Sequence, residues 1–433
     1  MTRIAFLSPQ PPTPTGVATY AAEVLRGLRR RGLGDRHGLE APWPLGGRTF
    51  EAVDRSDLAV YHVGNNAEFH GEIYRLAVSR PGLLVLHDLA LDDLVRWFLD
   101  AGDPMGHAAE AEADAARLGL FERRPDIEGP LATPWCAHVV RRSRGVIVHS
   151  EFGRGYLEAI GSRTPVFVVP HPVIEPPRAA RRAEERAARL RTLIAQPFLV
   201  GVLGDVGGAK GIEAVLTAAG ELGPETAVVI AGRRIPGYDV VEAVAASGVA
   251  DRVTVALDVS ERDFHAWLHA ADAVVNLRHP HRGEVSGTLV RAMAAGKPVV
   301  VQSVGTYLDW PRDSVVRIAA GEPDPGELAV SLQRLRDDPA WRDGIGRNAR
   351  AYTDRLRSED ATAAGYVAAI EETLSLTGDP ARLAEARWAS ALAQLGAGPD
   401  AAGLAERQVE SIEEIAGAPA PGVEWAGDSG RYG

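Results

Sequence analysis

Short apolar runs of strand length alternate with helical stretches along most of this chain, and no other feature of the sequence constrains the fold as strongly. In the first half, the runs cover residues 3–8, 58–63, 82–87 and 145–149. The rhythm then restarts, with runs at 198–204, 226–231, 252–257, 273–276 and 298–302. Strands that alternate with helices predict right-handed βαβ units and parallel sheets. We therefore predict two doubly wound α/β domains.

A proline-rich segment separates the two halves. Residues 170–177 (PHPVIEPP) hold four prolines, which neither a helix interior nor a central strand tolerates. We expect an N-terminal domain over residues 1–175, a linker and a helix over 176–194, and a C-terminal domain over 195–355. The last part of the chain, 377–433, is predicted to form two Ala-rich helices at 380–394 and 403–415, followed by a disordered end at 419–433.

Composition excludes several classes of protein. The 433 residues are 45% apolar and 24% charged, which is typical of a soluble globular protein. The single cysteine, Cys136, excludes a disulfide scaffold and a multi-cysteine zinc site, and it favours a reducing compartment. A net charge of −11 disfavours nucleic acid as a partner. No apolar run approaches 18 residues and the N-terminal run is too short for a secretory signal, so we expect a cytoplasmic protein.

In open parallel sheets, ligands bind beyond the carboxyl ends of the strands, so the loops there hold the candidate site residues. The first loop, SPQPPTPTGVATY, places Gly16 where a helix begins, with Thr15 as its N-cap. Exposed amides at such a helix start favour an anion, although a plain tight turn is the alternative. His87 and Asp88 end another strand, where the imidazole can be functional or structural. His62 and His149 end strands in the same way.

The second domain opens with GVLGDVGGAKG, in which Gly204, Gly207, Gly208 and Gly211 surround Lys210. Glycines expose backbone amides and lysine supplies a positive charge, a combination suited to phosphate. Gly211 stands where a P-loop has the hydroxyl residue that holds magnesium, so we expect no obligatory metal. Arg233 and Arg234 end the next strand and could add positive charge.

The segment 278–297, RHPHRGEVSGTLVRAMAAGK, is the strongest constellation. A helix is predicted to begin at 286–288 and to run to 296, and its small residues leave the first-turn amides open to a phosphate. Glu284 precedes the helix, where its carboxylate can reach sugar hydroxyls. Arg291 lies seven residues further on, at about the same face of the helix. A capped helix without a ligand is the alternative interpretation.

These motifs together resemble the family 4 retaining glycosyltransferases of GT-B fold. The resemblance rests on GDVGGAKG, AGRR and GEVSGTLVRAMAAGKPVV, with support from SPQPPTPTGVATY and VLHD, and it covers about residues 1–375. It implies two Rossmann-like domains that face a central cleft, with a nucleotide-diphosphate sugar held mainly by the C-terminal domain. It also implies a helix that crosses back to the first domain, for which we predict 359–374 within the segment 356–376, ahead of a C-terminal helical extension.

The resemblance also implies roles for individual residues. Lys210 would pair with the donor diphosphate, which Gly16 would border from the opposite domain. His87 matches the active-site histidine near the donor sugar, so His87, Lys210 and Glu284 are the predicted catalytic residues. The remaining predicted donor-site residues are Gly204, Arg233, Val285, Ser286, Gly287 and Thr288.

The sequence departs from the family pattern at two places. The family carries two glutamates seven residues apart, but in a gapless alignment Gly283 takes the first position, Arg291 takes the second, and Glu284 falls one place late. The second glutamate usually binds ribose. The arginine that the family often has in the lysine loop is also missing, and Arg233 or Arg291 could take its place.

We therefore expect a metal-independent retaining glycosyltransferase without a cofactor, whose acceptor is a hydroxyl of a glycan, a lipid-linked sugar or a small molecule. Two alternatives remain. One is a non-catalytic sugar-nucleotide-binding subunit of the same fold, and the other is a nucleotide-sugar epimerase that uses Asp88 and Glu284. The basic stretch 26–31 (RGLRRR) permits peripheral membrane contact, but a solvated helix end is favoured.

Overall fold

The computed structural model describes residues 2–102, 106–118, 129–174 and 177–376. The helices predicted at 380–394 and 403–415 and the disordered end predicted at 419–433 lie outside these described residues.

Two six-stranded parallel sheets form the framework of the molecule, as the alternation of strands and helices predicts. The first has the order β2-β1-β3-β4-β5-β6, with strands β1 (Arg3–Leu7), β2 (Gly38–Glu40), β3 (Leu58–Val63), β4 (Leu83–Leu86), β5 (Gly145–Val148) and β6 (Val166–Val168). The second has the order β12-β11-β10-β7-β8-β9, with strands β7 (Phe198–Val206), β8 (Thr226–Arg234), β9 (Val253–Leu257), β10 (Ala273–Val275), β11 (Val299–Gln302) and β12 (Val316–Ile318). The predicted fold class, two Rossmann-like domains, is confirmed.

Helices cover both faces of each sheet, which explains why the central strands are continuously apolar. The N-terminal domain contains α1 (Gly16–Arg30), α2 (Leu33–Arg36), α3 (Gly47–Arg55), α4 (Ala67–Ser79), α5 (Asp92–Asp100), α6 (His107–Leu118), α7 (Ala137–Arg141) and α8 (Glu151–Ala159). The second half contains α9 (Pro177–Arg191), α10 (Ile212–Glu221), α11 (Val240–Ala246), α12 (Glu261–Ala270), α13 (Gly287–Ala294), α14 (Pro325–Asp337) and α15 (Pro339–Ser358). Thr15 caps α1, as predicted, and Ser150 caps α8.

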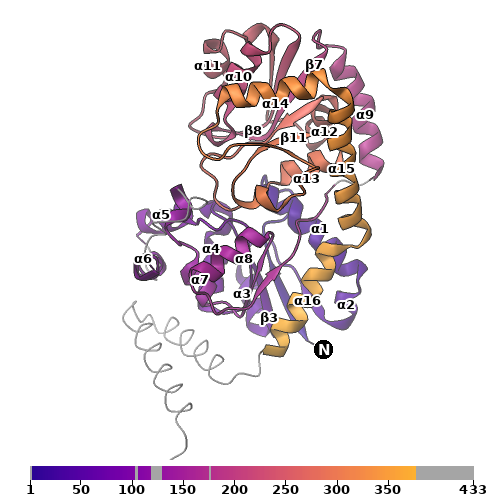
Figure 1. Ribbon diagram of the computed structural model, residues 1–433. Coiled ribbons are helices and arrows are strands. Elements are labelled where there is room, and N and C mark those ends of the chain that lie inside the picture. The colour runs from indigo at the N-terminus through magenta and orange to yellow at the C-terminus, as the bar shows by residue number, and fades with distance from the viewer. Residues whose placement is uncertain (1, 103–105, 119–128, 175–176, 377–433) are drawn as a thin grey trace, which may run out of the picture.

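The last described helix, α16 (Ala361–Ser375), returns to the N-terminal domain and lies beside α1 (Figure 1). Its Tyr366 side chain is fully buried, and the Tyr366 hydroxyl lies 2.8 Å from the hydroxyl of Tyr20 on α1, within hydrogen-bonding distance. Ala369 and Ile370 join the same apolar core as Ile147 of β5. The N-terminal domain is thus completed by residues from the far end of the described chain.

The basic end of α1 takes part in this junction. Arg30 and Arg31 pair with Asp360, which separates α15 from α16, at 3.2 Å and 3.0 Å. Arg26 pairs with Glu23 on its own helix. Three of the basic side chains in the stretch 26–31 therefore have partners within the molecule. In the described part of the chain, no helix is both long and apolar enough to cross a membrane.

Candidate functional site

Lys210 is joined to the start of α13 by a path of hydrogen bonds. Its side chain is buried at the end of a single 3-10 turn after β7, and Nζ donates to Oδ1 of Asn276 at 3.2 Å. Nδ2 of Asn276 donates in turn to Oγ of Ser286 at 2.8 Å. Ser286 is the N-cap of α13, whose Leu289 amide donates to the same Oγ. The lysine loop, the end of β10 and the α13 N-terminus therefore form one unit.

Gly204 allows these segments to approach closely. Its φ is +106°, and a Cβ placed on it would lie 2.7 Å from Oγ1 of Thr288 and 3.4 Å from Nζ of Lys210. Any other residue would be strained and would push into both side chains. The predicted residues Gly204, Lys210, Ser286 and Thr288 are thus brought together, while Gly287 and Thr288 remain partly accessible at the helix start.

The electrostatic surroundings of Lys210 favour an anion. Burial lowers the pKa of Lys210 well below its usual range, and the nearby Arg278 guanidinium lowers it further, while the carboxylates of Asp205 and Glu284 oppose this shift with smaller effects. Among the described residues, the amide oxygen of Asn276 is the acceptor that Nζ has, so no carboxylate neutralises the amine directly. The arginine whose charge acts on Lys210 is Arg278, and the expectation that Arg233 or Arg291 takes the place of the family's arginine stays a prediction.

Arg233 and Arg291 each form an ion pair, Arg233 with β7 just before the lysine loop and Arg291 with α12. The guanidinium of Arg233 pairs with Asp205 at 2.8 Å and also donates to the carbonyl oxygen of Pro14, in the loop that leads to Gly16. Gly16 itself is exposed, with no atom within 4 Å of the position its Cβ would take. Arg291 pairs with Glu261 of α12 at 2.9 Å and stacks over Phe264.

Glu284 is held in place rather than free. Its Oε1 accepts from Nε of Arg278 at 2.9 Å, and its Oε2 accepts from the backbone amide of Arg282 at 2.8 Å. The neighbouring Gly283 has a φ of +76°, and a Cβ there would lie 2.5 Å from Leu89 of the N-terminal domain. A glutamate cannot occupy position 283 with this backbone, which accounts for the carboxylate standing one residue later. Val285 is half-buried between Glu284 and the helix start.

Histidines and tyrosines gather where the strands of the first sheet end. His87 is half-buried after β4, and its Nε2 lies 3.1 Å from Nδ1 of His62 at the end of β3. The ring of Tyr20 meets the ring of His87 edge-on, with centroids 4.8 Å apart. His149 follows β5, with its ring centroid 5.4 Å from that of His87.

His171 extends this cluster of rings to the second domain. Its ring centroid lies 6.1 Å from that of His149, and its Nε2 would be 3.7 Å from a Cβ on Gly287. Imidazoles therefore extend from His87 to the first residue of α13. Burial lowers the pKa of His149 to about 4 and that of His171 to about 3, so both rings are neutral at pH 7.

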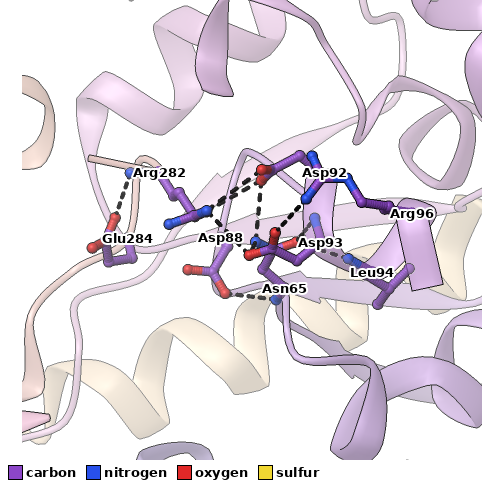
Figure 2. A network of polar contacts seen from close by, with 8 residues as sticks. All are labelled: Asn65, Asp88, Asp92, Asp93, Leu94, Arg96, Arg282 and Glu284. Carbon is purple, nitrogen blue, oxygen red and sulfur yellow. Dashed lines mark hydrogen bonds and ion pairs between the residues drawn. The ribbon is translucent and has the colours of Figure 1, made fainter. Parts of the chain in front are cut away.

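A polar network joins the two domains beside this cluster (Figure 2). The guanidinium of Arg282 reaches Asp92 at 3.2 Å and Asp93 at 3.1 Å, both at the start of α5. The carbonyl oxygen of Arg282 accepts from the backbone amides of Leu89 and Ala90 at 2.9 Å and 3.1 Å. The loop after β4 and the loop after β10 are thus in direct contact.

Asp88 lies within this network. Its Oδ2 accepts from the backbone amide of Asn65 at 2.8 Å. Burial raises the pKa of Asp88 to about 7, and the nearby carboxylate of Glu284 raises it as well. Asp88 is therefore a carboxyl group that changes its charge near neutral pH.

Sequence reasoning missed three residues of this site. Asn276 was assigned only to a strand, Arg278 only to a polar loop, and His171 only to the proline-rich linker. All three follow or adjoin the carboxyl ends of strands, where polar residues gather at sites of this architecture. Their place at the ends of strands is the feature of the sequence that could have identified them as site residues.

Comparison with known proteins shows that this chain is similar to glycosyltransferases. Residues 186–352 match the family model described as glycosyl transferases group 1. A curated relative, the 2-deoxystreptamine glucosyltransferase of Streptomyces kanamyceticus, is 28% identical over 222 residues, which is 49% of this chain and 57% of the relative. The match thus spans little more than half the length of this relative.

Solved structures share the fold over most of the chain. Sucrose-phosphate synthase from Thermosynechococcus elongatus has a TM-score of 0.62 and 17% identity, covering 87% of this chain and 100% of that one. HepE from Anabaena, solved in complex with UDP-glucose, has a TM-score of 0.59 and 16% identity at the same coverage. The predicted GT-B architecture is confirmed.

Proposed function

We propose that this protein, whose residues 186–352 match the family model described as glycosyl transferases group 1, transfers a sugar from a nucleotide-diphosphate sugar to an acceptor hydroxyl. We propose further that the transfer retains the anomeric configuration and needs no metal ion. The observation that carries the proposal is the path from buried Lys210 through Asn276 to Ser286 at the start of α13.

Breaking the donor's glycosidic bond leaves a diphosphate whose negative charge grows in the transition state. Lys210, Arg278 and the first amides of α13 converge where such a charge can be stabilised. A buried amine without a carboxylate partner is costly, and a bound diphosphate supplies the missing anion. Each charged hydrogen bond contributes about 1.5–3 kcal/mol. These positive groups take the role that a metal ion has in other transferases.

Retention follows if the acceptor hydroxyl attacks from the face that the diphosphate leaves. No carboxylate then has to act as a nucleophile, in contrast to retaining glycosidases. Glu284, whose two oxygens already accept hydrogen bonds, is suited to binding sugar hydroxyls with its remaining lone pairs. His87 would contact the donor sugar.

The N-terminal domain contributes to the other side of the donor. Gly16 leaves open space at the start of α1, and Arg233 reaches the loop that precedes it. Gly204, Val285, Gly287 and Thr288 would shape the pocket around the diphosphate and the sugar.

The test begins with the donor. UDP-, GDP- and dTDP-sugars are screened by thermal shift, because a bound ligand raises the melting temperature. The stabilising donor is then incubated with a panel of hydroxyl acceptors that includes cyclitols, since the curated relative is named for 2-deoxystreptamine. We expect a product of retained configuration by NMR, with a rate unchanged by EDTA.

Each other outcome contradicts a defined part of the proposal. Binding without transfer to any acceptor would indicate a non-catalytic subunit. An epimerised donor in the absence of acceptor would indicate an epimerase. An inverted product or a loss of rate with EDTA would overturn the mechanism but not the transferase activity.

A further inference from the structure

His62 is a buried polar side chain that the proposed reaction does not use. It is the penultimate residue of β3 and is fully buried. Its ring packs on Phe6, with centroids 4.5 Å apart, and stacks parallel to Tyr366 of α16. An apolar side chain would fill this position at less cost, because a buried imidazole without full hydrogen bonding is destabilising.

The contact of His62 with His87 restricts where both rings carry their protons. Nδ1 of His62 and Nε2 of His87 are 3.1 Å apart, so one of them donates and the other accepts. Burial lowers the pKa of both histidines well below the usual range, which makes both rings neutral and leaves one proton on each.

The surroundings of the far nitrogen of His62 decide between the two arrangements. Nε2 of His62 is buried and has no hydrogen-bond partner among the described residues. If His87 donated, His62 would carry its proton on Nε2, as a buried N–H without an acceptor. Orphaned N–H groups are rare in folded proteins, whereas an unused acceptor lone pair is tolerated more often. His62 therefore carries its proton on Nδ1 and donates to Nε2 of His87.

His87 must then carry its own proton on Nδ1, the ring nitrogen that has no hydrogen-bond partner among the described residues. The backbone amide of His87 donates to the carbonyl oxygen of Val63 at 2.8 Å, which holds the backbone from which the His87 side chain extends. His87 thus presents an N–H donor to a ligand.

The two neighbouring histidines present the opposite group. Nδ1 of His149 donates to the carbonyl oxygen of Val169 at 2.9 Å, and Nδ1 of His171 donates to the carbonyl oxygen of Pro172 at 2.9 Å. Both neutral rings therefore have an unprotonated Nε2, which can only accept. Among these three histidines, His87 is the one whose tautomer is set by another side chain.

We propose that His62 is a positioning residue that holds His87 as the Nδ1–H tautomer, so that His87 donates a hydrogen bond to an oxygen of the donor sugar. This inference rests on the proposed function for the identity of the ligand. The tautomer itself follows from contacts within the N-terminal domain.

The first test measures the tautomer without any substrate. Long-range ¹H–¹⁵N correlation spectra of histidine-labelled protein distinguish the two nitrogens of each neutral ring. We expect His87 to be protonated at Nδ1 and His62 at Nδ1. A wild-type His87 protonated at Nε2 would overturn the inference, whatever the variants do.

The second test compares His62→Asn with His62→Leu. The side-chain amide of asparagine can donate from about the position of Nδ1, whereas leucine has no donor. We expect His62→Asn to keep the tautomer of His87 and most of kcat. His62→Leu should lose the tautomer and lower kcat about tenfold, with a smaller change in the KM of the donor.

Equal loss of kcat in both variants, with no difference in the His87 spectrum, would show that His62 is only structural. Melting temperatures of both variants report any general damage to the fold. The expected tautomer in a protein that transfers no sugar would contradict the proposed function and leave the assignment of the protons intact.

Discussion

Lys210 is a buried amine that has no hydrogen-bonded carboxylate among the described residues to offset its desolvation. Its Nζ reaches only a neutral amide among the described residues, and the charge of Arg278 adds to the destabilisation of its protonated form. An anion that binds beside Nζ therefore stabilises the protonated form of this side chain. Binding of a diphosphate and protonation of Lys210 are therefore coupled.

Replacing Lys210 by methionine should weaken donor binding or lower turnover by at least tenfold, because one charged hydrogen bond contributes about 1.5–3 kcal/mol. The fold should persist, since methionine fills a similar volume without a polar atom. Steady-state kinetics and the thermal shift with donor measure the effect.

The matched control for this change is Arg234→Met. Arg234 also ends a strand of the second sheet, but its side chain is 64% exposed and its ion-pair contact, with Asp258, is 3.9 Å long. Kinetics that are unchanged in Lys210→Met, or equally reduced in both variants, would remove the proposed role of Lys210.

Asp88 should make the stability of the protein depend on pH in an unusual direction. Its pKa is about 7 in the folded state, above the ordinary value of an unfolded aspartate, so the folded state retains a proton that the unfolded state releases. The contribution of Asp88 to stability therefore falls as pH rises from about 4 to 7, and the penalty is fully present above pH 7.

Asp88→Asn should remove this penalty while its amide oxygen still accepts from Asn65. We expect the free energy of unfolding to increase more at pH 8 than at pH 5, relative to wild type. Urea unfolding of both proteins at the two pH values measures this difference in the free energy of unfolding. A change of the same size at both would show that the folded-state pKa of Asp88 is ordinary.

At the scale of elements, the loop between β10 and α13 connects the two domains. Arg282 lies on this loop and pairs with the start of α5, while its carbonyl oxygen binds the loop after β4 (Figure 2). The same loop carries Arg278 and Glu284. Domain contact and the geometry of the donor site are therefore set by the same loop, residues 276–286.

Arg282→Ala should loosen this contact. We expect a larger radius of gyration by small-angle scattering and a loss of about 1 kcal/mol in stability, because the ion pairs are only partly buried. Arg96→Ala is the control, since Arg96 binds the same Asp93 from within α5 and is 64% exposed. Scattering curves that are identical for wild type and Arg282→Ala would contradict a clamping role.

The sequence predicts the central strands and the edge strand β9, but it misses the other three edge strands. Central parallel strands are buried on both faces, so their apolar runs are continuous and visible, as in Leu58–Val63. The missed strands β2, β6 and β12 have three residues each and all lie at sheet edges. Their pairing depends on a neighbouring strand rather than on a pattern of their own.

The site shows a similar division. Lys210, Ser286 and Thr288 were identified because glycines and small residues at a helix start are visible in the sequence. Asn276 and Arg278 were missed because their roles arise from which loops come together, which a linear pattern does not contain. The displaced carboxylate of Glu284 has its explanation in Leu89, almost two hundred residues away.

At the scale of the whole molecule, a group of neutral buried histidines makes the N-terminal domain sensitive to acid. Burial lowers the pKa of His70 and His149 to about 4, and it lowers those of His62, His87 and His171 as well. Above the unfolded-state pKa of about 6.5, these histidines are neutral in both the folded and the unfolded state, so they do not make the free energy of unfolding depend on pH. Below it, the unfolded state binds protons that the folded state does not.

We therefore expect stability to fall as pH drops from 6.5 toward 4, before the carboxylates of the folded protein titrate. In wild type, the raised pKa of Asp88 opposes this fall in stability. The stability of Asp88→Asn should therefore fall more steeply with decreasing pH. Melting temperatures in steps of half a pH unit test the prediction. A flat profile between pH 6.5 and 4.5 in Asp88→Asn would show that the histidines titrate normally in the folded state.

A ribosome delivers this chain from its N-terminus, yet α16, which completes the core of the N-terminal domain, is made after every strand of both sheets. Until α16 has been synthesised, the hydroxyl of Tyr20 lacks its partner on Tyr366, and the core around Ile147 lacks the apolar side chains of Ala369 and Ile370. The half of the protein that emerges first therefore cannot complete its core before nearly all of the described chain has been made.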